Sequence, residues 1–129
     1  MKLVVAEEGS ELAMELWDTP HPAAASILAY PEGRAALAAA RRARRLTGAA
    51  HRDAVEDFDT TCAQVAVVGL DQALAHRAGD IAAELGLRGY DAVHLASAML
   101  LGAGTTFVTW DGELRSAAHG CGLSVAPAA

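Results

Sequence analysis

The chain has 129 residues, 53% of them hydrophobic, which is enough for one compact domain with a core and too few to expect two. A formal net charge of −6 argues against a protein that binds nucleic acid through a broadly basic surface, and no apolar run reaches the about 18 residues that a membrane-spanning helix needs. The two cysteines, Cys62 and Cys121, lack the spacing of zinc ligands, so we expect a single cytoplasmic domain over residues 1–129 with reduced thiols.

The first half of the chain is expected to be mostly helical. Its predicted elements are a helix at 3–8, a helix at 10–17 with Ser10 as N-cap, a short strand at 23–25, a helix from Ser26 to Gly48 and a helix at 51–62. The prolines of 18–22 end the second helix, because proline cannot continue the backbone hydrogen bonds. Pro31 lies inside the third helix and predicts a kink there, or a helix that begins near Pro31 itself.

The second half alternates strands and helices more clearly. Its predicted elements are a strand at 64–68, a helix from Asp71 as N-cap to Leu85 before Gly86, a helix at 91–101, a strand at 105–109, a helix at 113–119 and an edge strand at 123–125. The β-branched residues of 64–68 and 105–109 predict buried strands. The alternation predicts an α/β layer fold.

Three acidic residues lie where the ends of these elements would meet. Asp111 follows the strand at 105–109 by two residues, Asp91 begins a helix after a glycine-containing loop, and Glu32 lies in the first half of its helix. In an open parallel sheet, ligands bind beyond the carboxyl ends of the strands. Carboxylates that meet there without a compensating arginine or lysine would repel one another unless Mg²⁺ or Mn²⁺ bound between them. Such a site would support metal-assisted attack of water on a phosphodiester.

Each acidic residue also has an ordinary structural interpretation. Asp91 fits a helix N-cap, Asp111 a turn residue, and Glu32 a solvated helix carboxylate. His94 follows Asp91 by one helical turn, and we expect a packed or hydrogen-bonded core histidine there and leave it out of the site.

Four arginines fall within five positions of this acidic chain: Arg41, Arg42, Arg44 and Arg45. They predict either a local patch that contacts the phosphates of RNA or a solvated helix end, where cations favour the C-terminal dipole. Both interpretations remain open from the sequence.

Several segments, in this order and spacing, resemble one known family. They are SILAYPEGRAAL at 26–37, LGLRGYDAVHLASA at 85–98, FVTWDGEL at 107–114 and GCGL at 120–123. The chain resembles PIN-domain proteins of the VapC toxin type, the ribonucleases of bacterial toxin–antitoxin pairs, from Lys2 to Val125. The first segment is similar to the family's S-x-L-x-x-x-E pattern, although proline before the glutamate is unusual. The resemblance implies a three-layer α/β/α fold with a central parallel sheet.

The resemblance also implies a function. Glu32, Asp91 and Asp111 match three of the family's four metal-binding acids, so Asp91 would bind Mg²⁺ or Mn²⁺, Asp111 would complete the cluster, and Glu32 would bind metal or orient the attacking water. Thr109 would support Asp111 by a hydrogen bond. The implied protein is a metal-dependent endoribonuclease and homodimer, restrained by a cognate antitoxin. The alternatives are a catalytically inactive PIN-like module that binds antitoxin or RNA without cleavage, and an unrelated α/β domain whose acids are only caps.

The start of the chain departs from the family pattern. Family members begin with an apolar strand that ends in the first aspartate, whereas residues 1–10 read MKLVVAEEGS and match only the segment after it. Neither Glu7, Glu8 nor Asp18 lies where that carboxylate would be. We therefore expect the sheet to lack its central strand, and the native protein to carry about ten more residues upstream of Met1, a strand and its turn.

Overall fold

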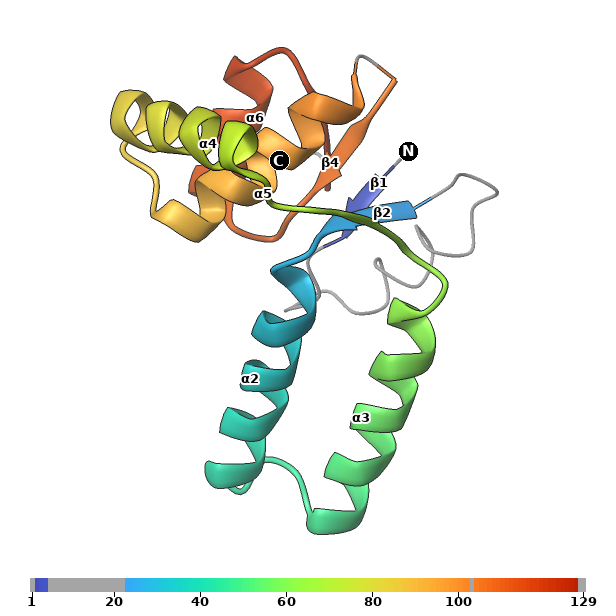
Figure 1. Cartoon of the computed structure of the whole chain (residues 1–129). Helices are drawn as coiled ribbons and strands as arrows, with labels where there is room; N and C mark the ends of the chain where they lie inside the picture. The colour runs from blue at the N-terminus through green and yellow to red at the C-terminus, as the bar shows by residue number, and fades with distance from the viewer. Residues whose placement is uncertain (1, 5–22, 103, 128–129) are drawn as a thin grey trace.

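The computed structural model describes residues 2–4, 23–102 and 104–127. The elements in chain order are β1 (Lys2–Val4), β2 (Ala23–Ser26), α2 (Ala29–Arg42), α3 (Gly48–Cys62), β3 (Ala66–Val68), α4 (Gln72–Leu85), α5 (Gly89–Leu101), β4 (Thr106–Val108), α6 (Gly112–Gly120) and β5 (Ser124–Ala126). In Figure 1, α4, α5 and α6 gather at the sheet, whereas α2 and α3 form a long hairpin that extends away from it.

The five strands form one sheet in the order β3-β2-β1-β4-β5. Every neighbouring pair is parallel, with β1 at the centre between β2 and β4 and with β3 and β5 at the edges. The predicted α/β fold with a central parallel sheet is therefore confirmed.

The centre of the sheet corrects two expectations about the start of the chain. Lys2–Val4 is a strand and not the beginning of a helix at 3–8, and it fills the central position that we expected to be missing. A short segment placed between two parallel neighbours gains backbone hydrogen bonds on both sides, which local propensity does not reveal. The rest of 3–8, the helix at 10–17, the residues 18–22, and with them Glu7, Glu8 and Asp18, lie outside the described residues. The upstream extension stays a prediction.

The core forms around α5, which is buried along most of its length. Ala92 through Ala98 are all buried, because this apolar helix packs between α4 and the sheet. Phe107 and Val108 of β4 are also fully buried, so the buried strand predicted at 105–109 is confirmed. Leu74 of α4 and Leu114 of α6 complete the same cluster, which ties these elements into one body.

The α2–α3 hairpin has a different character, since neither helix contains a buried residue. Its two helices pack on each other through a stacked pair of rings, Tyr30 and Phe58, whose centroids are 5.6 Å apart. The Tyr30 hydroxyl donates to Asp59 Oδ1 at 2.7 Å. A Cβ at Gly33 would overlap the Phe58 ring, so a larger residue there would force the ring to shift. The hairpin is therefore held together mainly by contacts within itself.

The hairpin helices match the prediction in part: α2 begins near Pro31 and α3 ends at Cys62 as expected, whereas the roles of Ser26 and Gly48 differ. Ser26 ends β2 and does not cap a helix, and its Oγ accepts the Leu28 N–H at 3.2 Å. The helix begins at Ala29, which puts Pro31 in the first turn, where a missing N–H costs no helical hydrogen bond. Gly48 does not end α2 but begins α3, whose N-cap is Thr47.

The second half follows the prediction more closely. Asp71 caps α4 by accepting the Leu74 N–H at 2.8 Å, and Gly86 ends the helix in the left-handed region at a φ of 66°. The strand predicted at 64–68 is shorter and is not buried. It lies at an edge of the sheet, and Val67 is 61% exposed. No helix in the described part of the chain is long and apolar enough to cross a membrane.

Candidate active site

Asp91 lies in the first turn of α5 but does not cap it. The N-cap position belongs to Arg88, so the N-cap interpretation of Asp91 is wrong. The Asp91 carboxylate instead accepts a hydrogen bond from Arg88 Nε at 3.0 Å. Its side chain is only 14% exposed. A carboxylate at this position is stabilised by the positive end of the helix dipole and stays available to a ligand.

Asp111 fits both of its predicted interpretations, as a turn residue and as a site residue. Its two carboxylate oxygens have different partners. Oδ1 caps α6 by accepting the backbone N–H groups of Glu113 at 2.9 Å and Leu114 at 3.1 Å. Oδ2 faces the NH2 atom of Arg88 at 3.7 Å. Thr109 supports Asp111 by a hydrogen bond, as predicted. The bond is made to the backbone of Asp111, whose N–H donates to the Thr109 hydroxyl at 3.2 Å.

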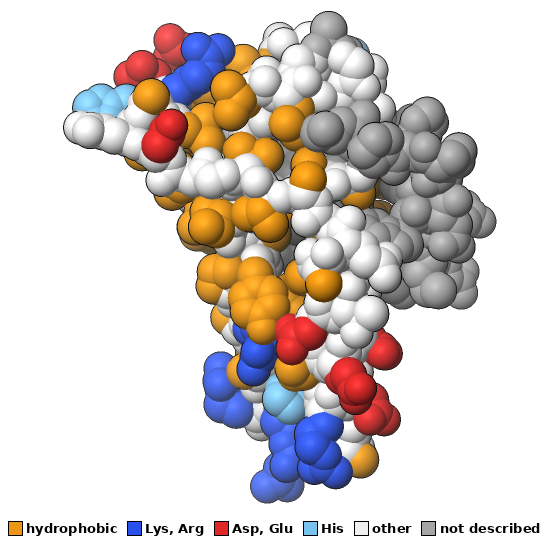
Figure 2. Space-filling model, turned by 45° about the vertical axis from the view of Figure 1, so that its right-hand side comes forward, with side chains coloured by type: hydrophobic (Ala, Val, Ile, Leu, Met, Phe, Trp, Pro, Cys, Tyr) orange, Lys and Arg blue, Asp and Glu red, His pale blue; other side chains and the backbone are white. Residues whose placement is uncertain are grey.

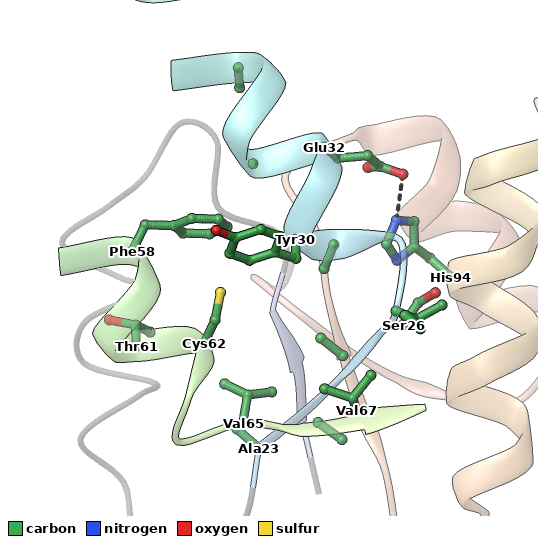
Figure 3. A pocket seen from close by; sticks show the side chains of 16 residues that line it. Ala23, Ser26, Tyr30, Glu32, Phe58, Thr61, Cys62, Val65, Val67 and His94 are labelled. Atoms are coloured by element: carbon green, nitrogen blue, oxygen red, sulfur yellow. Dashed lines mark hydrogen bonds and ion pairs between the residues drawn. The ribbon is translucent and has the colours of Figure 1, made fainter. Parts of the chain in front are cut away.

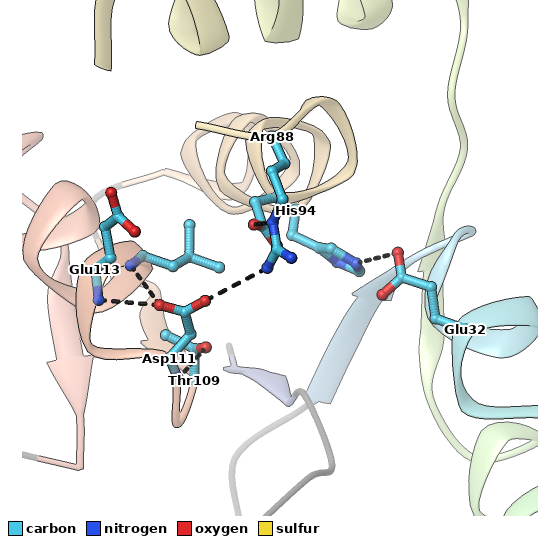
Figure 4. Close-up of polar contacts among 8 residues, drawn as sticks. Glu32, Arg88, His94, Thr109, Asp111 and Glu113 are labelled. Atoms are coloured by element: carbon cyan, nitrogen blue, oxygen red, sulfur yellow. Dashed lines mark hydrogen bonds and ion pairs between the residues drawn. The ribbon is translucent and has the colours of Figure 1, made fainter. Parts of the chain in front are cut away.

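Asp91 and Asp111 face one pocket beyond the carboxyl end of β4. The pocket has a volume of about 380 Å³ and lies between the N-termini of α5 and α6, with Arg88 and Glu113 also in its lining. Figure 4 shows the Arg88 side chain reaching across to Asp111. The sequence therefore predicted correctly that these two aspartates meet at this edge of the sheet.

The electrostatics of the pocket differ from the expectation. We expected carboxylates without a compensating base, and Arg88 supplies that base. Its hydrogen bond to Asp91, followed by the charge of Asp91, raises the pKa of the Arg88 guanidinium, and Tyr90 and Asp111 add to this. An arginine is charged at any pH of interest, so it partly neutralises both carboxylates.

Glu32 is not part of this pocket. It lies in the first turn of α2, and its Oε1 atom is 3.0 Å from Nε2 of His94. In Figure 4, Glu32 and the Asp111 carboxylate lie on opposite sides of His94. Within the residues that the structure describes, no group of three His, Cys, Asp or Glu residues is close enough to hold one metal ion. The predicted three-acid cluster is thus divided between a pair and a separate glutamate.

His94 is a buried, hydrogen-bonded histidine, as predicted, but its partner is one of the predicted site residues. It lies one turn after Asp91 on α5, and its side chain is only 3% exposed. It connects the helix that carries Asp91 to the helix that carries Glu32. The spacing from Asp91 was the only available signal of this role, because Glu32 is 62 positions away in the sequence. Among the described residues, the Nδ1 atom of His94 has no hydrogen-bond partner.

The four arginines lie at the far end of the hairpin. Arg41 and Arg42 form the last turn of α2, and Arg44 and Arg45 follow it, all of them exposed. Figure 2 shows Lys and Arg side chains gathered at the lower end of the molecule, which is the tip of the α2–α3 hairpin in Figure 1. The helix between its first residue and Arg42 is about 20 Å long, so the patch is well separated from the pocket. The position fits both interpretations, phosphate contact and a solvated C-terminus.

A second cavity, of about 360 Å³, lies between the hairpin and β2 and β3. Its lining is mainly apolar, with Ile27, Tyr30, Phe58 and Val67 among its residues, and Glu32 and His94 lie at one end (Figure 3). This cavity has few of the charged groups that a hydrolytic site needs, whereas the pocket of Asp91 and Asp111 is lined by several of them.

The aspartate pair fits a hard divalent cation. Mg²⁺ in proteins is commonly bound by one or two carboxylates and keeps several waters. Oδ2 of Asp91 and Oδ2 of Asp111 both face Arg88, so both are directed to the same place.

Comparisons with known proteins identify the family of the chain. The sequence model of the family described as PIN domain matches residues 2–120. The chain is 46% identical over 129 residues to Ribonuclease VapC45 and to Ribonuclease VapC49, from two strains of Mycobacterium tuberculosis, covering 99% of this chain and 90% of each relative. A solved structure described as a toxin–antitoxin complex from Klebsiella pneumoniae has a similar fold, with a TM-score of 0.58, 17% identity, and coverage of 84% of this chain and 83% of that chain.

Proposed function

The chain belongs to the PIN domain family, and from this membership we propose that it is a metal-dependent endoribonuclease, the toxin of a toxin–antitoxin pair. The identity of 46% with ribonucleases named VapC supports the activity. The observation that carries the proposal is the pair Asp91 and Asp111, whose carboxylates face one pocket at the carboxyl end of β4.

We assign the metal to the aspartate pair. Asp91 and Asp111 would hold Mg²⁺ or Mn²⁺, which when bound activates water and stabilises charge on the phosphodiester. Asp111 Oδ1 fixes the start of α6, and Thr109 holds the Asp111 backbone, so Oδ2 is oriented before any ligand arrives. Such preorganisation is favourable because no rearrangement has to accompany the reaction.

We assign Glu32 to the water or to the metal. It is carried by a different element from the aspartates, and His94 holds its carboxylate at 3.0 Å. A carboxylate anchored in this way can accept a proton from an attacking water. Glu32 would thus act from a separate element and not as an equal third member of the aspartate pair.

The proposed partners rest on the family membership and on the relatives and the structural neighbour that the chain matches. We propose a homodimer that binds RNA and is inhibited by a cognate antitoxin, with Arg41, Arg42, Arg44 and Arg45 contacting the RNA backbone. An RNA substrate and the two free thiols, Cys62 and Cys121, favour a cytoplasmic location.

Two observations favour the inactive alternative. Glu32 lies apart from the aspartates, and Arg88 already pairs with both of them. A PIN module that binds antitoxin or RNA without cleavage would tolerate this arrangement. The two functions differ in whether metal-dependent cleavage exists.

The test is cleavage of single-stranded RNA by the purified protein with Mg²⁺ or Mn²⁺ and with excess EDTA. We expect cleavage only with metal, its loss in Asp91→Asn, and its retention in Asp80→Asn, a matched change on the exposed face of α4. Equal cleavage by Asp91→Asn and the unchanged protein would reject the proposed site. Binding of RNA without cleavage under any metal would favour the inactive module.

A further inference from the structure

The guanidinium of Arg88 lies where the two aspartates would share a cation. Its Nε atom is 3.0 Å from Oδ2 of Asp91, and its NH2 atom is 3.7 Å from Oδ2 of Asp111. The same two oxygens are the atoms that the proposed function assigns to the metal. The guanidinium of Arg88 therefore occupies the position that the proposed function assigns to the metal ion.

We propose that Arg88 is an internal counter-ion that competes with the divalent cation for Asp91 and Asp111, and that cation binding releases its side chain. This inference rests on the proposed function, because it takes the aspartate pair as the metal site. It adds that the pocket exists in two states, one closed by an arginine and one open to the cation.

The contacts of Arg88 are suited to such an exchange. Its side chain is 64% exposed, so the charge remains hydrated and the two ion pairs contribute little. The separation of 3.7 Å from Asp111 is also longer than a direct hydrogen bond. A divalent ion carries twice the charge and can approach each oxygen more closely. The exchange therefore needs no rearrangement of α5 or α6.

Tyr90 offers the released side chain a second partner. The Arg88 Cζ atom lies 4.9 Å from the centre of the Tyr90 ring, and Tyr90 is 45% exposed. A guanidinium over a tyrosine ring is held by a cation–π interaction. Arg88 can thus leave the carboxylates and remain next to the pocket.

A simple positioning role predicts the opposite effect of removing Arg88. If Arg88 only orients Asp91, its loss lets the carboxylate move and weakens metal binding. If Arg88 competes with the metal, its loss strengthens metal binding. The sign of the change in metal affinity separates the two.

The experiment is a calorimetric titration of the full, EDTA-treated chain with Mn²⁺ alone at constant ionic strength. Arg88→Gln is expected to bind Mn²⁺ up to about fivefold more tightly than the unchanged protein, equal to about 1 kcal/mol. Arg88→Lys, which keeps the charge but cannot span both carboxylates, is expected between them. The control Arg77→Gln removes an equal charge from the exposed face of α4, outside the pocket lining, and should stay within about twofold.

The outcomes separate this inference from the proposed function. Unchanged or weaker Mn²⁺ binding by Arg88→Gln overturns the inference, and if Asp91→Asn still abolishes binding, the metal site stands without it. Asp91→Asn that binds Mn²⁺ like the unchanged protein overturns both. Binding that appears only in Arg88→Gln supports both. Arg88 is exposed, so its variants should fold, and circular dichroism checks this.

Discussion

The two halves of the candidate site lie in regions of very different construction. Asp91 lies in the first turn of α5 and Asp111 caps α6, and both helices belong to the buried body of α4, α5, β4 and α6. Glu32 lies on the α2–α3 hairpin, in which no residue is buried. The hydrogen bond between His94 and Glu32 joins the two regions at the site. The half that is proposed to bind metal is therefore fixed by the core, whereas the position of Glu32 depends on where the hairpin is held.

The largest effect on activity is expected from changes at Asp111. Its two oxygens have different roles, so substitutions there can distinguish helix capping from the proposed metal binding. Asp111→Asn should reduce metal-dependent RNA cleavage by roughly 100-fold or more, since even outer-shell partners of a metal are worth 10–100-fold. Asparagine caps helices well, so the melting temperature should barely change. Asp111→Ala should lose the same activity and in addition about 1 kcal/mol of stability. Activity that follows the melting temperature in these two variants would reduce Asp111 to a cap.

Glu32→Gln tests whether the hairpin half acts separately from the metal. We expect kcat to fall by roughly 10- to 100-fold, because the variant loses a general base. Mn²⁺ affinity should change by less than about threefold, since Asp91 and Asp111 remain. Kinetics and Mn²⁺ calorimetry measure the two quantities on one protein sample. Loss of Mn²⁺ binding would instead make Glu32 a metal ligand and erase the distinction between the regions.

His94→Gln tests the hydrogen bond between His94 and Glu32 that connects the two regions. This variant should lower kcat about tenfold through a misplaced Glu32, and the same change in a Glu32→Gln background should have little further effect on kcat. A fully additive loss of activity would show that His94 acts only through the core. Ser97→Ala, which removes the hydroxyl that donates to the Val93 carbonyl on the same helix, controls for buried polar changes.

The smallest effect is expected at the arginines on the hairpin tip. Replacing Arg41, Arg42, Arg44 and Arg45 by glutamine should flatten the salt dependence of RNA binding, by about 0.7 in the log–log slope for each phosphate that an arginine no longer neutralises. The value of kcat at saturating RNA should stay the same, because the patch is remote from the pocket. Fluorescence anisotropy across a salt series measures the slope. An unchanged slope would leave the arginines as a solvated helix end.

The same contrast explains what the sequence could and could not predict. Local sequence signals were sufficient in the buried body. Asp71 begins α4 and Gly86 ends it, as predicted, and the strand predicted at 105–109 pointed to Asp111 as the residue at its carboxyl end. Contacts between distant segments were not predictable. The pairing of His94 with Glu32 spans 62 positions, and the place of Lys2–Val4 in the sheet depends on two neighbours far along the chain.

Arg88 shows a third case, in which a nearby residue was overlooked. It is only three positions from Asp91, yet the predicted site contained carboxylates alone. An arginine at that spacing before an aspartate in a first turn is a usable signal, because positions three apart share a helix face.

The most direct test of the proposed metal site is a crystal structure of the protein with Mn²⁺, using the anomalous scattering of manganese to locate the ion. We expect a peak about 2 Å from a carboxylate oxygen of both Asp91 and Asp111, with the Arg88 side chain moved away from Oδ2 of each. A manganese ion bound elsewhere, for instance at Glu32 and His94, or an aspartate pocket that keeps Arg88 at saturating Mn²⁺, would contradict it.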